Sequence, residues 1–237
     1  MQALPTGAEK QEKVREMFDS IAPRYDLLNR LMTLGLDSSW RTRCVTLLGL
    51  RPGSVVLDLG CGTGDLTREL RERSFRGFGV DISLGMLRHA PEGTGPLVRA
   101  DGGRLPLREA AVDGAVSGFA LRNFSDLDAV AGELARVLRP GGRVSLLEVS
   151  EPVHPLLRAG HAVWFRRVVP LLGGLLSDAA AYRYLPRSVA YLPSEAELQR
   201  LLQTAGFREV RLQRLSGGIV QIVTATRAAK TTKGFRP

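Results

Sequence analysis

Short apolar stretches alternate with amphipathic ones through the middle of the chain. The apolar stretches predict strands at residues 55–59, 77–80, 97–100, 115–119 and 144–149. The stretches between them have helical spacing, and the clearest, 125–138, begins at a serine cap and ends before Pro140. Regular alternation of strand and helix predicts a doubly wound, mainly parallel α/β sheet with right-handed crossovers.

The pattern differs toward both ends. Residues 13–50 are helical in pattern, and prolines interrupt the sheet pattern between 151 and 191. A helix at 194–204 and strands at 207–215 and 219–225 then complete seven strands. We therefore divide the chain into an N-terminal helical cap (1–50), a ligand-binding core (51–150), a lid insert (151–191), a C-terminal part of the core sheet (192–227) and a loose tail (228–237).

A glycine-rich turn follows the first predicted strand. Residues 54–64 read SVVLDLGCGTG, so Asp58 stands near the strand end and Gly60, Gly62 and Gly64 alternate after it. Glycines let the backbone pass close to a ligand where a side chain would collide. A dinucleotide-binding turn has the different spacing Gly-x-Gly-x-x-Gly. The spacing found here resembles motif I of the class I S-adenosylmethionine-dependent methyltransferases, and this resemblance implies that cofactor, with S-adenosylhomocysteine as product.

Further candidates for the cofactor site stand at the predicted carboxyl ends of the strands. A carboxylate at Asp81 would accept hydrogen bonds from both ribose hydroxyls, and Asp58 would orient the turn or the cofactor's ammonium group. Thr63 would donate hydrogen bonds to the methionine carboxylate of the cofactor, and Asp101 with the N–H of Gly102 would contact the edge of its adenine. The alternative for each acid is a helix cap. The core residues expected to bind the cofactor are Asp58, Gly60, Gly62, Thr63, Asp81, Ile82, Asp101, Gly102 and Gly118.

Composition and charge narrow the class of protein. The chain has 237 residues, 44% of them hydrophobic, which suits a globular protein. Its net charge of +9 is scattered without long basic clusters, so we expect a solvated basic surface and no nucleic-acid partner. Cys44 and Cys61 lack the spacing of a zinc or redox site, and we expect no metal. No apolar run reaches the roughly 18 residues of a membrane span, which together with the polar N-terminus predicts a cytoplasmic protein.

Several longer segments resemble the demethylmenaquinone and 2-polyprenyl-benzoquinol C-methyltransferases. The first is residues 25–40, YDLLNRLMTLGLDSSW, and the second is residues 178–185, DAAAYRYL, with Ser188 in register after it. Residues 121–123, LRN, and 136–142, RVLRPGG, agree as well. The chain departs from the family at Asp37 and Ser38, where His-Arg is usual. The resemblance implies C-methylation of a prenylated quinol.

The resemblance also implies roles for individual residues. Arg122 would stabilise the phenolate form of the acceptor, and Asn123 would orient a quinol oxygen. Tyr25 would close over the cofactor, and Asn29, one helical turn further on, would contact the acceptor. Alternatives stay open: Arg122 would instead pair with an acid such as Asp126, and Tyr25 would simply pack its helix. The last two candidates, Tyr182 and Tyr184, would line the acceptor entrance or pack the lid.

The expected acceptor shapes the list of partners. A prenyl tail needs an apolar channel or access to a bilayer, and residues 163–176 combine apolar residues with an arginine pair. We expect transient contact with the inner face of a membrane, while the oligomeric state stays open, a homodimer included. The arginine-rich composition is typical of a high-GC bacterium, where menaquinone is common, and we therefore expect a naphthoquinol rather than a benzoquinol. The competing functions are methylation of a soluble phenol and cofactor binding without catalysis.

Overall fold

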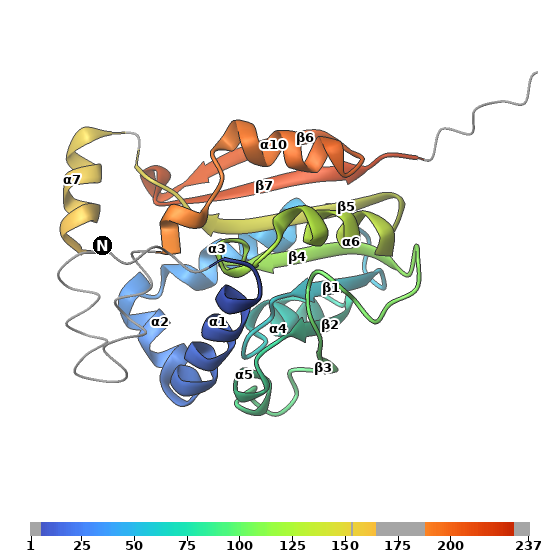
Figure 1. Ribbon diagram of the computed structural model, residues 1–237, viewed down its shortest axis with the longest axis horizontal. Coiled ribbons are helices and arrows are strands. Elements are labelled where there is room, and N and C mark those ends of the chain that lie inside the picture. The colour runs from blue at the N-terminus through green and yellow to red at the C-terminus, as the bar shows by residue number, and fades with distance from the viewer. Residues whose placement is uncertain (1–5, 153, 165–187, 230–237) are drawn as a thin grey trace, which may run out of the picture.

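A seven-stranded sheet forms the centre of the computed structural model, which describes residues 6–152, 154–164 and 188–229 (Figure 1). The strand order is β3-β2-β1-β4-β5-β7-β6. Along this order, the first five strands, from β3 through β2, β1 and β4 to β5, pair in parallel. Strand β7 runs antiparallel to both of its neighbours, β5 and β6. The predicted doubly wound, mainly parallel fold is therefore confirmed. The strands are β1 (Val55–Leu59), β2 (Arg76–Asp81), β3 (Leu97–Arg99), β4 (Val112–Gly118), β5 (Leu138–Val149), β6 (Phe207–Leu215) and β7 (Val220–Arg227).

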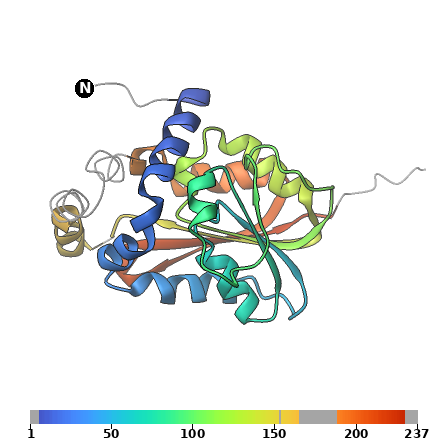
Figure 2. The same ribbon diagram turned by 90° about the horizontal axis from the view of Figure 1, so that it is seen from below.

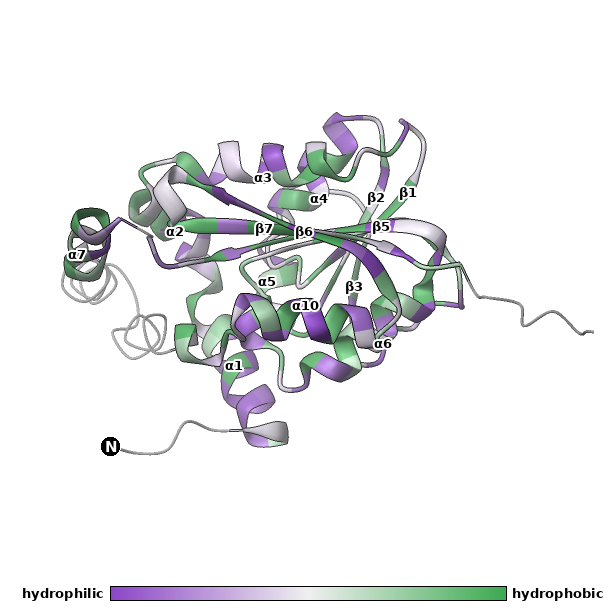
Figure 3. Cartoon of the chain, turned by 90° about the horizontal axis from the view of Figure 1, so that it is seen from above, coloured by the Kyte–Doolittle hydropathy of each residue, from purple (hydrophilic) through white to green (hydrophobic). Residues whose placement is uncertain are grey.

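Helices cover both faces of the sheet (Figure 3). One face carries α3 (Leu36–Leu47) and α4 (Asp65–Glu72), and the other carries α5 (Leu84–Arg88), α6 (Leu127–Val137) and α10 (Glu195–Thr204). The central strand β1 contributes to both apolar cores, with Val56 in one and Leu57 in the other. Each such buried side chain contributes about 1.5–3 kcal/mol. Burial on both faces explains why the apolar run of β1 does not alternate with polar residues.

The N-terminal region folds into α1 (Gly7–Ile21), the 3-10 helix η1 (Ala22–Arg24), α2 (Tyr25–Thr33) and α3. The first helix begins at Gly7 rather than residue 13, because its opening turn is polar and carries no apolar periodicity. Positive φ angles of 52° at Leu34 and 75° at Gly35 end α2 and turn the chain into α3. As a result, α1 runs beside α5, on the face opposite α3 and α4 (Figure 2).

Two local predictions were wrong. The side chain that caps α6 belongs to Asp126, not Ser125: its Oδ1 accepts the N–H of Ala129 at 2.9 Å. Aspartate and serine cap helices about equally well, so adjacent candidates are not separated by sequence. Strand β5 begins at Leu138 instead of residue 144, because Leu138 already pairs with β4 before the register shifts.

The insert after β5 is described only in part. It contains α7 (Pro155–Val163) and the 3-10 helix η4 (Val189–Tyr191). Tyr182 and Tyr184 lie outside the described residues, as do most of residues 163–176 and most of the predicted tail. Within the described ranges, no helix is long and apolar enough to cross a bilayer.

The start of α10 offers a test of the fold. Ser194 Oγ accepts the N–H of Glu197 at 3.3 Å, and the Glu197 carboxylate accepts the N–H of Ser194 at 2.8 Å. Replacing Ser194 by alanine removes one half of this capping box, so we expect the free energy of unfolding to fall by about 1 kcal/mol. Denaturant unfolding measures the change. Ser39→Ala is the control, because that exposed hydroxyl donates only to the Leu36 carbonyl; equal losses in the two variants would contradict the prediction.

Candidate active site

Two adjoining cavities lie along the edge of the sheet where the parallel strands end. The first, about 80 Å³, is bordered by α1 and by the residues that follow β1, β2, β3 and β4. The second, about 370 Å³, is bordered by α2, α3, α7 and the end of β5. Phe18, Tyr25 and Phe119 line both cavities and therefore mark their junction. Open parallel sheets bind their ligands at this edge.

The glycine turn forms the floor of the first cavity. Gly60 and Gly62 have φ angles of 68° and 57°, in the left-handed region that favours glycine. The N–H of Gly62 donates to Asp81 Oδ2 at 2.8 Å, and Asp81 Oδ1 accepts the N–H of Ser83 at 2.8 Å. Burial raises the pKa of Asp81, although these backbone donors work in the opposite direction. Asp81 therefore fastens the turn to the end of β2 and keeps lone pairs for a ligand.

Two predicted cofactor residues lie behind the turn instead of lining the cavity. Asp58 is fully buried and accepts a hydrogen bond from Thr67 Oγ1 at 2.7 Å. Its Oδ1 has no hydrogen-bond partner among the described residues, and burial raises the pKa of Asp58 to about 7. Thr63 Oγ1 donates to Asp26 Oδ1 at 2.6 Å. In this arrangement both side chains support the turn and join it to α2.

Helix α1 closes the first cavity through polar contacts that no sequence pattern indicated. Lys10 Nζ donates to the carbonyl of Phe124 at 2.7 Å and lies 3.8 Å from the centre of the Tyr191 ring. Burial lowers the pKa of Lys10 to about 8. Gln11 Nε2 donates to Asp101 Oδ2 at 2.8 Å. Helix α1 therefore holds the side chain of Asp101, the residue predicted to contact the adenine.

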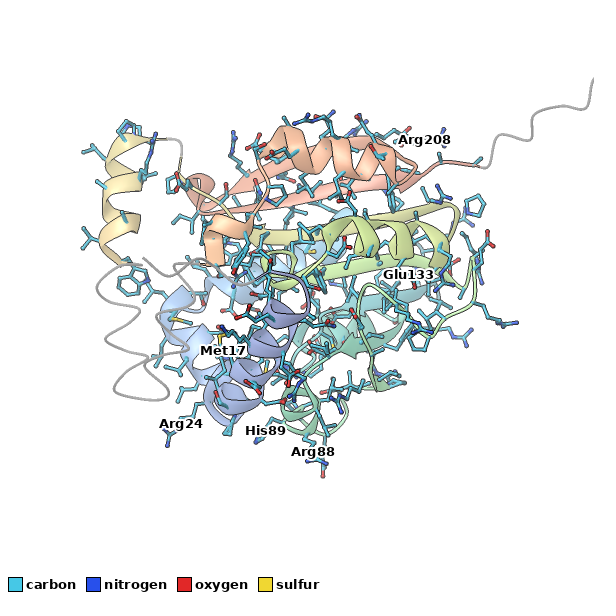
Figure 4. All side chains as sticks on the ribbon, in the orientation of Figure 1. Met17, Arg24, Arg88, His89, Glu133 and Arg208 are labelled. Carbon is cyan, nitrogen blue, oxygen red and sulfur yellow. The ribbon has the colours of Figure 1, made fainter. Side chains whose placement is uncertain are left out.

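The C-terminal half of α1 is anchored next to Asp81. Asp19 Oδ1 accepts hydrogen bonds from Ser83 Oγ at 2.6 Å and from the N–H of Gly85 at 2.7 Å. A Cβ on Gly85 would stand 2.8 Å from the Asp19 backbone, so only glycine allows this approach. Figure 4 labels three side chains of this region: Met17 on α1, and Arg88 and His89 at the C-terminal end of α5.

The second cavity is apolar with one polar side. Trp40 and Phe119 pack edge to face, with ring centres 6.3 Å apart. On the polar side, Arg41 forms ion pairs with Asp37 and, at 2.8 Å, with Asp65. Burial opposes the charged form of Asp37, but the guanidinium of Arg41 outweighs it and lowers the pKa of Asp37. The departure from the family at Asp37 thus supplies a buried partner for a buried arginine.

Arg122 lies on η2 (Leu121–Asn123), directly after β4, and lines the second cavity. Its Nη1 lies 2.5 Å from Glu148 Oε1 and donates to the Phe119 carbonyl at 2.7 Å. Its Nε donates to Ser188 Oγ at 3.0 Å. The acid that pairs with Arg122 is therefore Glu148, from β5, and not Asp126, which caps α6. The pairing leaves Nη2 without a hydrogen bond to any described residue.

Asn123 faces the other way and lines the first cavity. Its Oδ1 is buried and has no hydrogen-bond partner among the residues that the structure describes. Phe119, just before η2, has a φ of 59°, an unfavourable value for a bulky residue that is typical of functional sites. Consecutive residues of η2 thus reach both cavities from one short turn.

Most of the predicted site residues come together here, whereas Phe18, Gln11, Arg41, Phe119 and Glu148 were missed. Asn29 lines the second cavity, and Tyr25 lies at the junction, where burial raises its pKa. No described group of three or more His, Cys, Asp or Glu side chains could hold a metal ion. The predicted cofactor residues that line the first cavity are Tyr25, Gly60, Gly62, Asp81, Ile82, Asp101, Gly102 and Gly118.

The residues that line the first cavity suit S-adenosylmethionine in their chemistry. A Cβ on Gly60 would come within 2.6 Å of Ala120, and one on Gly62 within 3.0 Å of Met86, so a side chain is disfavoured at these two positions. Asp81 offers a carboxylate beside the turn for the ribose hydroxyls. Asn123 Oδ1 is a hydrogen-bond acceptor that no described residue satisfies, so it could accept a hydrogen bond from the cofactor.

Comparison with known proteins identifies the family. The sequence model described as the ubiE/COQ5 methyltransferase family matches residues 6–227. The chain belongs to the ubiE/COQ5 methyltransferase family. It is 41% identical to the ubiquinone/menaquinone biosynthesis C-methyltransferase UbiE of Syntrophotalea carbinolica, over 92% of this chain and 95% of that one. It is 43% identical to the demethylmenaquinone methyltransferase of Thermus thermophilus, over 87% of this chain and 97% of that one.

Solved structures support the fold of this family member. An S-adenosylmethionine-dependent methyltransferase of Thermotoga maritima superposes with a TM-score of 0.65 at 18% identity, over 90% of this chain and 99% of that one. The [4+2]-cyclase SpnF superposes with a TM-score of 0.67 at 17% identity, over 97% of this chain and all of that one. Because a cyclase shares the architecture, the fold alone does not assign methyl transfer; the family membership does.

The buried carboxyl of Asp58 predicts an unusual pH dependence of stability. Its pKa is about 7 in the folded protein and about 4 in an unfolded chain, so between these values the folded state binds the extra proton. The contribution of Asp58 to the stability of the wild-type protein therefore falls as the pH rises from about 4 to 7. Replacing Asp58 by asparagine removes this loss, so we expect the melting temperature of the variant to gain on that of the wild type between pH 5 and pH 8.

Thermal unfolding of the cofactor-free proteins measures the difference. Asp128→Asn is the control, because it removes the same charge from an exposed position. Parallel pH curves for Asp58→Asn and wild type would show that Asp58 titrates as an ordinary acid.

Proposed function

We propose that this chain transfers a methyl group from S-adenosylmethionine to a ring carbon of a prenylated quinol, converting demethylmenaquinol to menaquinol. The observation that carries the proposal is an arginine at the wall of an apolar cavity that adjoins the cofactor cavity. The names of the relatives, demethylmenaquinone methyltransferase among them, support the same acceptor class.

The first cavity would bind the methyl donor, and the second would bind the acceptor. S-Adenosylmethionine supplies an electrophilic methyl group on a sulfonium sulfur. Asp81 and the glycine turn would hold its ribose and amino-acid portions, and Asp101, held by Gln11, would meet the adenine. Tyr25, Phe18 and Phe119 at the junction would align the methyl with the acceptor and exclude water. Such alignment supplies a large share of the rate enhancement in two-substrate reactions.

Arg122 would activate the acceptor. A ring carbon becomes nucleophilic when the neighbouring hydroxyl is ionised, and a phenol with a pKa near 10 costs about 4 kcal/mol to ionise at pH 7. The guanidinium of Arg122 would stabilise the phenolate through Nη2, while Glu148, Ser188 and the Phe119 carbonyl hold the rest of the group. A guanidinium is not a proton acceptor, so the hydroxyl proton passes to water. The ring hydrogen then leaves as a proton after methyl transfer, which restores aromaticity.

Elements outside the core sheet would complete the site. Helices of the N-terminal cap would close over the cofactor, and the insert at 151–191 would cover the acceptor. Asn29 would contact a quinol oxygen from the wall of the second cavity. We place the protein in the cytoplasm, with reversible contact at the inner face of the membrane.

A single-turnover assay with radiolabelled methyl donor tests the function. The acceptors are a reduced demethylmenaquinol, a benzoquinol that lacks the ring methyl, and a soluble phenol. We expect label in the naphthoquinol. Label in the phenol alone would favour the soluble-substrate alternative, and donor binding by calorimetry without turnover on any acceptor would favour a non-catalytic protein.

Glu148 is expected to position Arg122. Glu148→Gln keeps the size of the side chain and removes the charge that fixes the guanidinium, so we expect kcat to fall by about tenfold to a hundredfold with donor affinity unchanged. Single-turnover rates and calorimetric titration of the donor measure the two quantities. Asp126→Asn is the matched control, since that acid caps α6 and does not reach Arg122; equal effects on kcat would contradict the assignment.

A further inference from the structure

Large apolar side chains are exposed beside the mouth of the second cavity. On α2, Leu27 and Leu31 are separated by one helical turn and share a face, and Leu34 is the residue at which α2 ends. Leu34 is 74% exposed, and on α7 Leu156 is 78% exposed. Figure 3 shows hydrophobic positions along both helices. We call this surface the leucine face, which consists of Leu27, Leu31, Leu34, Leu36, Leu156 and Leu157.

The leucine face is continuous with the second cavity. Leu34, Leu36, Leu156 and Leu157 are exposed and also line the cavity, so the same side chains form its wall and its rim. The volume of about 370 Å³ lies near the lower end of the range for one drug-sized ligand, roughly 300–1,000 Å³. A quinol ring system fits that range, whereas a long prenyl chain attached to it must leave through the mouth, across these leucines.

The exposed charged residues that the structure describes at α2 and α7 are basic. Arg24 precedes α2 and extends away from the ribbon (Figure 4), Arg30 is exposed on α2, and Arg158 is exposed on α7. The two helices contain one acid between them, Asp26, and its carboxylate accepts a hydrogen bond from Thr63 on the inner side of α2. An apolar face bordered by arginines matches a bilayer with anionic headgroups. A second copy of this chain would bring like charges together and fits less well.

We propose that the leucine face docks on an anionic lipid bilayer and that the prenyl tail of the acceptor stays in the lipid while its ring enters the second cavity. This inference rests on the proposed function for the identity of the tail. It assigns contact to α2 and α7, where the sequence had indicated residues 163–176. Tyr25 lines the cofactor cavity and Asp26 accepts a hydrogen bond from Thr63 of the glycine turn, so α2 lies between the leucine face and the cofactor site.

Vesicle binding tests the proposal. Leu27→Gln/Leu31→Gln alters two residues of the leucine face that line neither cavity. We expect co-sedimentation of the wild-type protein with phosphatidylcholine vesicles that contain phosphatidylglycerol, weaker binding without the anionic lipid, and binding weakened by about tenfold in the double variant. Val98→Gln is the matched control, because Val98 is 41% exposed, as is Leu31, but lies on β3 away from the mouth.

Two activity measurements separate this inference from the proposed function. A short-chain demethylnaphthoquinol in vesicle-free solution reports folding and catalysis, and a long-chain one presented in vesicles reports docking. We expect the double variant to keep the first rate and lose about tenfold of the second. Wild-type turnover without vesicle binding, or equal losses with Val98→Gln, would overturn the docking surface and leave the function standing. A wild-type dimer that the double variant converts to a monomer would assign the leucine face to a second copy instead. Vesicle binding without turnover on either quinol would overturn the function and with it the assignment of the tail.

Discussion

The carboxylate of Asp81 connects the parts of the molecule that make the site. It receives the N–H of Gly62 from the turn after β1 and the N–H of Ser83 from the start of the next helix. Ser83 in turn donates its hydroxyl to Asp19, which anchors α1. The floor of the cofactor cavity, the end of the second strand and the helix that closes the cavity thus meet at one partly buried acid. Burial raises its pKa, and the backbone donors keep the carboxylate form accessible.

Electrostatics distinguishes the two cavities. Acids surround the first, where Asp81 and Asp58 stand at and behind the glycine turn, and this suits a cationic sulfonium. Arginines border the second, where Arg41 and Arg122 suit an ionising hydroxyl. Each arginine is itself neutralised by an acid from another element, which limits the cost of burying it. The junction between the two cavities is lined by the aromatic side chains of Phe18, Tyr25 and Phe119.

Helix α2 has a different role on each side. Its inner side places Tyr25 at the junction of the cavities and joins Asp26 to the glycine turn through Thr63. Its outer side exposes Leu27 and Leu31. A periodicity of 3.6 residues lets nine residues serve both purposes, with the cofactor turn on one side and an apolar surface on the other.

The sequence by itself determined the architecture, the glycine turn and the place of Asp81 at the carboxyl end of a strand, because strand periodicity and turn chemistry are local properties. It did not determine which acid pairs with Arg122: the near neighbour Asp126 was the candidate, and Glu148 on the adjacent strand is the partner. Nor did it indicate that Lys10 would reach the carbonyl of Phe124, a contact across 114 residues. Such partners depend on how the sheet brings distant elements to one edge, and no local pattern records that distance. Only the tertiary structure decided them.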